Sequence, residues 1–409
     1  MRAPAVFSIR SFRLLFAGQA VSVVGDSLFP VALAFAVLGE LNGTPAQLGL
    51  VLAAQTLPLA VLILAAGVWA DRLNRRNVMI VSDLGRAAVQ AALAALLLTD
   101  SAQLWHVVVL VAFYGAFEAG FRPALGGLIP HVAGREHLQQ ANALMGIAQN
   151  FGMVLGPALA GVLIAIAGPG TAIALDAGTF VISAAFLATL RVRHERTSAT
   201  EHHFLADLMG GIAEVRKRRW MWTFMPAFST YHLLALPCVL ALGPVIADRE
   251  LDGASSWAAI TVAFGIGTIV GSTIALRTYP RRPMFGATIA FMFAAAQAPI
   301  IAYGGSTAII AALELLAGIA VAYGFTLWET SLGREIPPQA LSRVISLDWF
   351  TTTGAMPLGF ALVAPAAQLL GTRATMLACG LVVIALCAAA LAAGDVRRLT
   401  APPRSPAVP

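Results

Sequence analysis

Long apolar runs alternate with short polar connections along the whole chain. A helix that crosses the hydrocarbon core of a bilayer needs about 20 mainly apolar residues, and we find twelve runs of this kind. They cover residues 13–38, 46–70, 77–98, 104–124, 139–167, 170–191, 221–246, 256–276, 284–302, 305–328, 343–369 and 373–393. The pattern predicts an all-α integral membrane protein with twelve transmembrane helices.

The longest polar segment, residues 192–220, separates two groups of six runs. Its sequence predicts an amphipathic helix over about 203–218 that lies on the membrane surface. A weak internal repeat supports two related halves, because an Ile-Pro pair precedes a long run at Ile129 and again at Ile336. We predict six-helix bundles at 1–191 and 221–393 that are related by pseudo-symmetry, with the linker between them and a tail at 394–409.

The basic residues predict the orientation of these spans, since cytoplasmic loops of membrane proteins carry an excess of Lys and Arg. If both termini are cytoplasmic, all of the 26 Lys and Arg residues except Arg249 and Arg373 fall on the cytoplasmic side. This sorting counts Arg86 among the cytoplasmic charges. We therefore expect a multi-pass cell-membrane protein whose linker and two termini face the cytoplasm.

The composition agrees with burial in lipid. Charged residues make up 11% of the chain, against roughly 25% in soluble domains, and the mean hydropathy is +0.81. The pI of about 9.8 does not indicate nucleic-acid binding, because the basic residues form short clusters between apolar runs instead of one basic face. Cys238, Cys379 and Cys387 lie in apolar runs without a CxxC spacing, so we expect no disulfide, metal site or cofactor.

Sequence motifs of other functional classes are missing. Lys217, the only lysine, lacks the glycine-rich sequence that a phosphate-binding loop requires, and neither G-x-S-x-G nor HExxH occurs. We therefore do not expect an enzyme or an ATP-driven pump. Uphill transport would then use an ion gradient. A non-transporting membrane sensor or interaction protein on the same scaffold, or a proton-coupled importer, remains the alternative.

The stretch "GVWADRLNRR", residues 67–76, resembles the G-x-x-x-D-R-x-x-R-R signature of the major facilitator superfamily. The matching residues are Gly67, Asp71, Arg72, Arg75 and Arg76. The resemblance implies that Asp71 contacts the N-terminus of the span that begins near Arg343 and closes the cytoplasmic side. We expect Glu118 to pair with the arginines in a breakable network, and Asp348 to take part in gating.

A second stretch, "GMVLGPALAG" at 152–161, is similar to the G-x-x-x-G-P-x-x-G-G motif of exporters in this superfamily, with Ala160 replacing one glycine. The resemblance implies that this span faces the one containing Gly267 and Gly271 and that the chain exports its solute. The residues of the packing motif are Gly152, Gly156, Pro157, Gly161, Gly267 and Gly271.

The stretch "FRLLFAGQAVSVVGDSLFPVALA" at 12–34 and the stretch within 142–184 resemble the branch that contains macrolide-efflux and enterobactin-export proteins among drug:proton antiporters. One residue of many such antiporters, an arginine midway in the fourth span, is absent from "VVVLVAFYGAFEAGF". Their coupling scheme is therefore not transferred to this chain.

Ionisable side chains within the spans are candidates for binding, because each costs about 2.5–3.5 kcal/mol at the bilayer centre. Asp26, halfway along the first span, is expected to carry the coupling proton or to meet a cationic substrate, unless it is a structural acid. Glu314, His232 and Asp176 are further candidates for proton or substrate binding. We expect a monomeric, proton-coupled exporter of small amphiphilic, drug-like or siderophore-like solutes.

Overall fold

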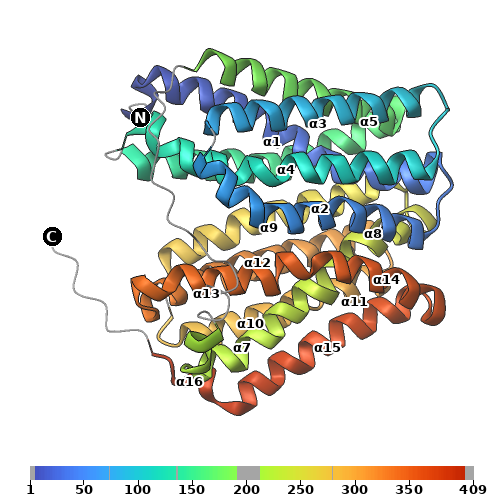
Figure 1. Cartoon of the computed structure of the whole chain (residues 1–409). Coiled ribbons are helices and arrows are strands. Elements are labelled where there is room, and N and C mark those ends of the chain that lie inside the picture. Colours follow the sequence, from blue (N-terminus) through green and yellow to red (C-terminus); the bar gives the residue numbers. More distant parts are fainter. Residues whose placement is uncertain (1–4, 73, 135–136, 191–211, 279, 401–409) are drawn as a thin grey trace. The chain divides into compact units, whose positions relative to one another are not determined.

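The computed structural model describes residues 5–72, 74–134, 137–190, 212–278 and 280–400. This described part contains no β-strand and is almost entirely helical (Figure 1). Its longer helices are α1 (Arg10–Phe35), α2 (Pro45–Arg72), α3 (Arg75–Leu98), α4 (Leu104–Ala133), α5 (Leu138–Thr189), α7 (Arg219–Thr230), α8 (Leu236–Glu250), α9 (Ala254–Arg277), α10 (Pro283–Ala294), α11 (Gln297–Tyr303), α12 (Thr307–Glu335), α13 (Pro338–Thr351), α14 (Met356–Leu370) and α15 (Thr372–Ala393).

Short elements continue some of these helices. Two π-helical turns, η2 (Ala36–Glu40) and η4 (Tyr231–Ala235), prolong α1 and join α7 to α8. The remaining short elements are η1 (Ala5–Ser8), η5 (Thr353–Ala355) and α16 (Asp395–Arg398).

The twelve-span prediction is confirmed. Eleven helical segments of the described residues are long and apolar enough to cross a membrane. One segment lies in α5, whose 52 residues would extend about 78 Å at a rise of 1.5 Å per residue, more than twice a hydrocarbon core of about 30 Å. Gly168, with a φ of 77°, interrupts α5. The helix therefore contains the fifth and sixth spans.

Two helices extend further than their apolar sequences predict. The apolar runs end at residues 124 and 328, but α4 continues to Ala133 and α12 to Glu335. The apolar run of a span marks the lipid core, whereas the backbone hydrogen bonds of its helix can continue into the polar region beyond it.

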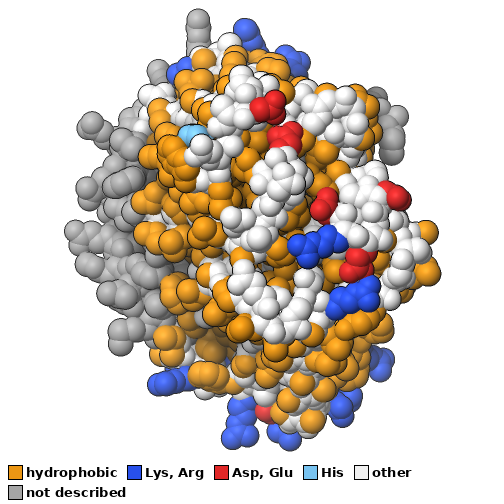
Figure 2. Space-filling model, turned by 90° about the vertical axis from the view of Figure 1, so that its right-hand side faces the viewer, with side chains coloured by type: hydrophobic (Ala, Val, Ile, Leu, Met, Phe, Trp, Pro, Cys, Tyr) orange, Lys and Arg blue, Asp and Glu red, His pale blue; other side chains and the backbone are white. Residues whose placement is uncertain are grey.

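The protein surface carries many hydrophobic side chains. On the face shown in Figure 2, hydrophobic side chains cover much of the described surface and charged ones are few. Leu369, Ile166 and Phe293 are 85%, 75% and 65% exposed. Soluble monomers rarely expose large contiguous apolar surfaces, so this distribution is the one expected for helices in contact with lipid.

The chain divides into two compact units. Unit 1 comprises Met1–His202, Pro244–Val262 and Phe360–Pro365, and unit 2 comprises His203–Gly243, Ala263–Gly359 and Ala366–Pro409. The predicted bundle limits stay a prediction. Residues 191–211, which hold most of the expected linker helix, lie outside the described part, and residues 212–216 are helical.

Two basic residues directly before α7 pair with an acidic residue one helical turn earlier. Glu214 accepts hydrogen bonds from Lys217 Nζ at 2.6 Å and from Arg218 Nη1 at 2.8 Å. These two donors lower the pKa of the Glu214 carboxyl below its usual value.

In unit 1, α1 packs between the two halves of α5. Gly18 of α1 contacts Phe186 and Ser183 in the second half, whereas Ser27 contacts Gly156 in the first half. Helix α2 packs on α4 at Gly115, where an added Cβ would lie 1.9 Å from the carbonyl oxygen of Gln55.

Unit 2 brings α12 against α9 and α10. The backbones of α9 and α12 touch through Gly267 and Gly318, since a Cβ on Gly318 would lie 2.2 Å from the Phe264 carbonyl oxygen. Helix α15 packs on α7, α10 and α11. The core between these helices is aromatic, with Phe224, Phe228, Phe291, Tyr231 and Trp328 almost fully buried.

The contact between α2 and α4 generates a prediction. Gly115→Ala should lower the free energy of unfolding by about 1–3 kcal/mol, because the added methyl group must push two helix backbones apart. Gly178→Ala is the control, since nothing lies within 4 Å of a Cβ at Gly178. Thermal unfolding in detergent, followed by tryptophan fluorescence, measures both variants. Equal unfolding temperatures would contradict the described contact.

Candidate functional site

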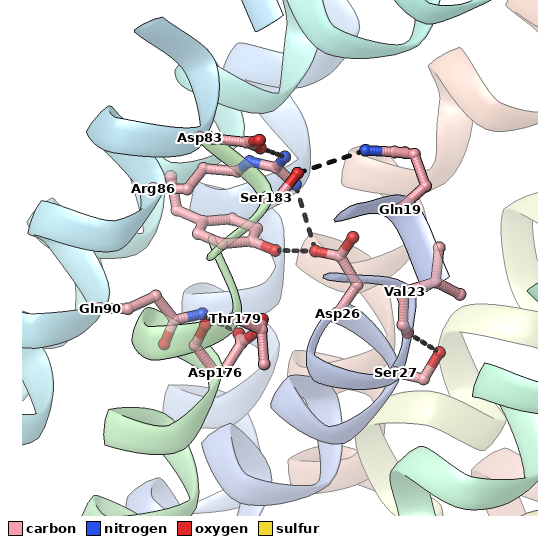
Figure 3. Close-up of polar contacts among 11 residues, drawn as sticks. Gln19, Val23, Asp26, Ser27, Asp83, Arg86, Gln90, Asp176, Thr179 and Ser183 are labelled. Carbon is pink, nitrogen blue, oxygen red and sulfur yellow. Dashed lines mark hydrogen bonds and ion pairs between the residues drawn. The ribbon is translucent and has the colours of Figure 1, made fainter. Parts of the chain in front are cut away.

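The Asp26 carboxylate lies at the centre of a polar cluster in unit 1. Its Oδ1 accepts hydrogen bonds from Arg86 Nη1 on α3 and from the Tyr114 hydroxyl on α4, each at 3.1 Å. Figure 3 shows Asp26 pointing from α1 toward Arg86, with Asp83 beside the guanidinium group of Arg86. Three spans therefore meet at one carboxylate.

The preceding residue, Gly25, allows α1 to approach this cluster. A Cβ at Gly25 would lie 2.2 Å from Asp176 Oδ1 and 2.3 Å from Thr179 Oγ1 of α5. A larger residue would therefore displace these side chains or the helix that carries it. Consecutive positions of α1 thus have different tasks: Gly25 permits the close helix contact, and Asp26 faces Arg86.

Arg86 is held on several sides. Its Nη2 donates to Asp83 Oδ1 at 2.6 Å, one helical turn earlier on α3. The guanidinium carbon lies 4.5 Å from the ring centroid of Phe121 and 4.1 Å from that of Phe180, within the range of cation–π attraction. The side chain is 2% exposed. Packing, ion pairing and aromatic contacts together fix the guanidinium position.

The ion cluster of Asp26, Asp83 and Arg86 contains one cation and two carboxyl groups. The Asp83 side chain is 0% exposed, whereas the Asp26 side chain is 34% exposed. An uncompensated charge in a buried site costs several kcal/mol. If both aspartates were ionised, their pairing with one arginine would leave an excess negative charge, so one proton would make the cluster neutral. Asp26 is the carboxyl group that water can reach.

A cavity of about 460 Å³ lies beside Asp26. Its volume is within the range of about 300–1,000 Å³ that is common for small-molecule sites. Phe29, Phe121, Leu125 and Met153 provide apolar lining. The polar lining consists of Gln19, Asp26, Ser27, Gln55, Arg86, Tyr114, Glu118, Arg122 and Gln149. All these residues belong to unit 1, and they come from α1 to α5.

The predicted candidate Asp176 lies near Asp26 in a different environment. It is fully buried on α5, where it accepts hydrogen bonds from Gln90 Nε2 at 2.6 Å and from Thr179 Oγ1 at 3.2 Å (Figure 3). It does not line the cavity. Its neutral partners and complete burial indicate a structural contact between α3 and α5.

The structure places the two other binding candidates in unit 2. Glu314 is 2% exposed on α12 and accepts a hydrogen bond from Gln297 Nε2 at 2.8 Å. His232 lies in η4, where its Nδ1 is 2.9 Å from the Phe228 carbonyl oxygen. A carbonyl can only accept, so this contact indicates that the proton of the neutral ring is on Nδ1.

The predicted gating residues make different contacts. Arg76 donates to the carbonyl oxygens of Leu187 and Ala188 at the end of α5, and Arg75 Nη1 lies 3.5 Å from His131 Nδ1. Asp348 of α13 accepts a hydrogen bond from Trp328 Nε1 at 3.2 Å.

Glu118, the expected partner of the arginines, lines the cavity with Asp26 instead of bonding to Arg76. The surroundings of Gly67 and the side chains of Asp71 and Arg72 lie outside the described part of the structure. The gating role of the motif therefore stays a prediction.

The glycines of the exporter-like motif pack closely on neighbouring helices. Gly152 and Gly156 lie one helical turn apart, directly before Pro157. They contact Val23 and Ser27 of α1. Gly161 approaches Ala258, which belongs to the same unit.

Gly267 and Gly271 of α9 lie directly against the backbone of α12. A Cβ at Gly267 would lie 2.1 Å from the Leu315 carbonyl oxygen, and one at Gly271 would lie 2.3 Å from that of Ile319. The close approach that these glycines permit is therefore between the eighth and tenth spans.

Sequence analysis missed the central cation of the site. We counted Arg86 as a cytoplasmic charge, which is wrong, because it lies near the middle of α3 and is 2% exposed. Asp83 and Tyr114 were not among the candidates either. One signal was available: an acid and a base three residues apart inside the apolar run 77–98 can form an ion pair on one helix face.

A comparison with known protein families identifies the family of this chain. The sequence pattern of the Major Facilitator Superfamily matches residues 15–360 of the chain. The chain belongs to the Major Facilitator Superfamily. Members of this superfamily are transporters, and the twelve spans in two units agree with its fold.

Relatives within the superfamily cover nearly the whole chain. Macrolide efflux protein A of Streptococcus pyogenes is 25% identical over 396 residues, which are 95% of this chain and 97% of that protein. Multidrug efflux pump Tap of Mycolicibacterium fortuitum is 27% identical over 391 residues, with 91% and 93% covered. The crystal structure of nucleoside transporter NupG has a TM-score of 0.73 at 14% identity, covering 96% and 100% of the two chains. This last likeness shows the shared fold.

The ion cluster generates a prediction for this superfamily member. Arg86→Gln should lower the free energy of unfolding by about 3–5 kcal/mol, because it leaves Asp83 buried without a cation. The double variant Asp83→Asn with Arg86→Gln should recover much of that loss.

Thermal unfolding of the purified variants in detergent tests the coupling between these residues. Arg10→Gln, which changes an exposed arginine at the start of α1, is the control. If the double variant were as unstable as Arg86→Gln, the buried charge of Asp83 would not be the cause.

Proposed function

We propose that this chain exports small amphiphilic solutes in exchange for protons, and that Asp26 carries the proton. The observation that supports the proposal is the position of Asp26: it borders a cavity of about 460 Å³ and shares its ion-pair partner Arg86 with a second, buried carboxylate. A group in this position can exchange protons with water and contact a solute in the same cavity.

The shared arginine provides a mechanism. When Asp26 is ionised, its carboxylate attracts Arg86. When Asp26 takes up a proton, that attraction falls, and Arg86 remains paired with Asp83, the nearer carboxylate at 2.6 Å. Protonation thus changes the interaction between α1 and α3. Because protons and solute would bind to the same carboxylate, each would lower the affinity for the other.

The cavity lining supports an amphiphilic solute with a positive charge. Asp26 and Glu118 can attract a cation, and the rings of Phe29 and Phe121 offer apolar and cation–π contacts. Two relatives carry the names macrolide efflux protein and multidrug efflux pump. Arg122 also lines the cavity, so catecholate siderophores belong in the same substrate panel.

The direction of transport and the orientation belong to the proposal as well. The likeness of 152–161 to an exporter motif favours export over import. The distribution of Lys and Arg supports cytoplasmic termini. We further propose that the chain works as a monomer in the cell membrane.

Transport in proteoliposomes tests the role of Asp26. In the absence of a membrane potential, each proton exchanged per solute multiplies the solute gradient that a tenfold proton gradient can support by about ten. Asp26→Asn should remove this factor, because an amide cannot bind the proton. Solute binding in the absence of a gradient should remain measurable. The panel contains hydrophobic cations, macrolides and catecholate siderophores.

The matched control is Asp100→Asn. Asp100 is exposed at the end of α3 and has a φ of 52°, a conformation in which asparagine is also favoured. Full pH-driven transport by Asp26→Asn would exclude Asp26 as the proton carrier. Absence of any flux by the wild-type chain with the whole panel would favour the sensor alternative, and solute uptake in the opposite direction would favour the importer.

A further inference from the structure

A second buried acid, Glu314 in unit 2, has a hydrogen-bonded environment without a cation. Its Oε2 accepts from Gln297 Nε2 at 2.8 Å, and Gln297 Oε1 accepts from the Tyr231 hydroxyl at 2.7 Å. All three side chains are at most 3% exposed. Tyr231, Gln297 and Glu314 thus form a continuous chain of hydrogen bonds across three spans.

The helices that surround Glu314 contain few ionisable residues. In the described part of the chain, no Lys, Arg or His forms an ion pair with Glu314. Helix α10 has no ionisable residue, α9 has only Arg277 at its end, and α11 has only Tyr303, which is exposed. On α13, Asp348 bonds to Trp328.

An ionised carboxylate in such a place would cost several kcal/mol without a compensating cation. The neutral acid avoids this cost and still accepts the hydrogen bond from Gln297. Glu314 Oε1 has no hydrogen-bond partner in the structure. Because Oε2 accepts an N–H donor, a proton on this carboxyl group would be carried by Oε1.

The other two members of this chain of hydrogen bonds lie at interruptions of their helices. Tyr231 is the first residue of the π-helical turn η4, and Gln297 is the first residue of α11, directly after the break between α10 and α11. Such irregular turns inside membrane helices are frequent at binding sites, where they can change conformation more easily than a regular helix.

The break before α11 is packed against α15. A Cβ at Gly380 would lie 2.6 Å from Pro299 Cδ and 2.7 Å from the Ala295 carbonyl oxygen. Pro299 has no N–H to donate to the preceding turn. The backbone at Gly380 therefore fits closely against the irregular segment that presents Gln297.

We propose that Glu314, Gln297 and Tyr231 form a second proton-binding site, in unit 2, whose proton is exchanged during transport. Glu314 binds the proton, Gln297 positions the carboxyl group, and the Tyr231 hydroxyl polarises Gln297 by donating to its carbonyl. The step is a reversible loss of the proton from Glu314 to water. Its contribution to coupling depends on the proposed function, whereas its protonation does not.

Infrared spectroscopy of the purified protein tests the proton directly. The wild-type chain should show the C=O band of a buried protonated carboxyl group, and the band should shift in D₂O if the proton exchanges. Glu314→Gln should lose this band. Gln297→Leu should move it to higher frequency, because the carbonyl loses its N–H donor, and Tyr231→Phe should move it less.

The control for these spectra is Glu335→Gln, which removes an exposed carboxyl group at the end of the same helix and should leave the band unchanged. If the band is the same in Glu314→Gln and wild type, Glu314 is ionised and the proposal is wrong. If the wild-type band does not respond to D₂O even during solute turnover, the proton is permanent and its exchange is excluded.

Steady-state solute gradients in proteoliposomes test the coupling. Glu314→Gln should lower the gradient reached per tenfold proton gradient by about tenfold, which corresponds to about one proton fewer per solute. An unchanged gradient overturns the role in coupling. Asp26→Asn is measured in parallel: if it alone keeps the wild-type gradient, the proposed role of Asp26 fails while the result for Glu314 stands.

Discussion

The ion pairing of one buried arginine with two aspartates is the interaction on which the N-terminal site depends. In a medium of low dielectric constant, Arg86 is tolerated only with carboxylates beside it, and Asp83 at 2.6 Å supplies the permanent partner. Asp26 is the second partner and the more exposed one. The position of α1 relative to α3 is therefore linked to the charge on a group that water can reach.

Close backbone contacts give this electrostatic arrangement its precision. Gly25 brings α1 against Asp176 and Thr179, so that the neighbouring Asp26 faces α3. Gly115 does the same for α2 and α4. In lipid, helices gain little from hydrophobic association with one another, so packing of small residues and polar contacts must supply much of the stability. At Gly25 a close helix contact and buried polar groups accordingly occur at the same place.

The two units treat their buried acids differently. Asp26 in unit 1 is compensated by a cation and borders a cavity. Glu314 in unit 2 accepts a hydrogen bond from a neutral amide and is almost fully buried. A carboxylate next to arginine can stay ionised at moderate cost, whereas one next to glutamine is most stable when protonated. Two units of one chain can thus hold buried acids with different preferred charge states.

The amino-acid sequence by itself determined the helical class, the twelve spans and the superfamily, because span length and local motifs are properties of contiguous residues. It also singled out Asp26 and Glu314 as unusual charges. Only the tertiary structure decided their partners. The sequence alone led us to count Arg86 as a cytoplasmic charge. The packing of α1, α3 and α4 shows that it lies in the interior. Glycine spacing likewise indicated a close helix contact at Gly267 without identifying α12 as the partner. Ion pairs and helix contacts depend on which faces meet in three dimensions, and residues far apart in the chain supply those faces.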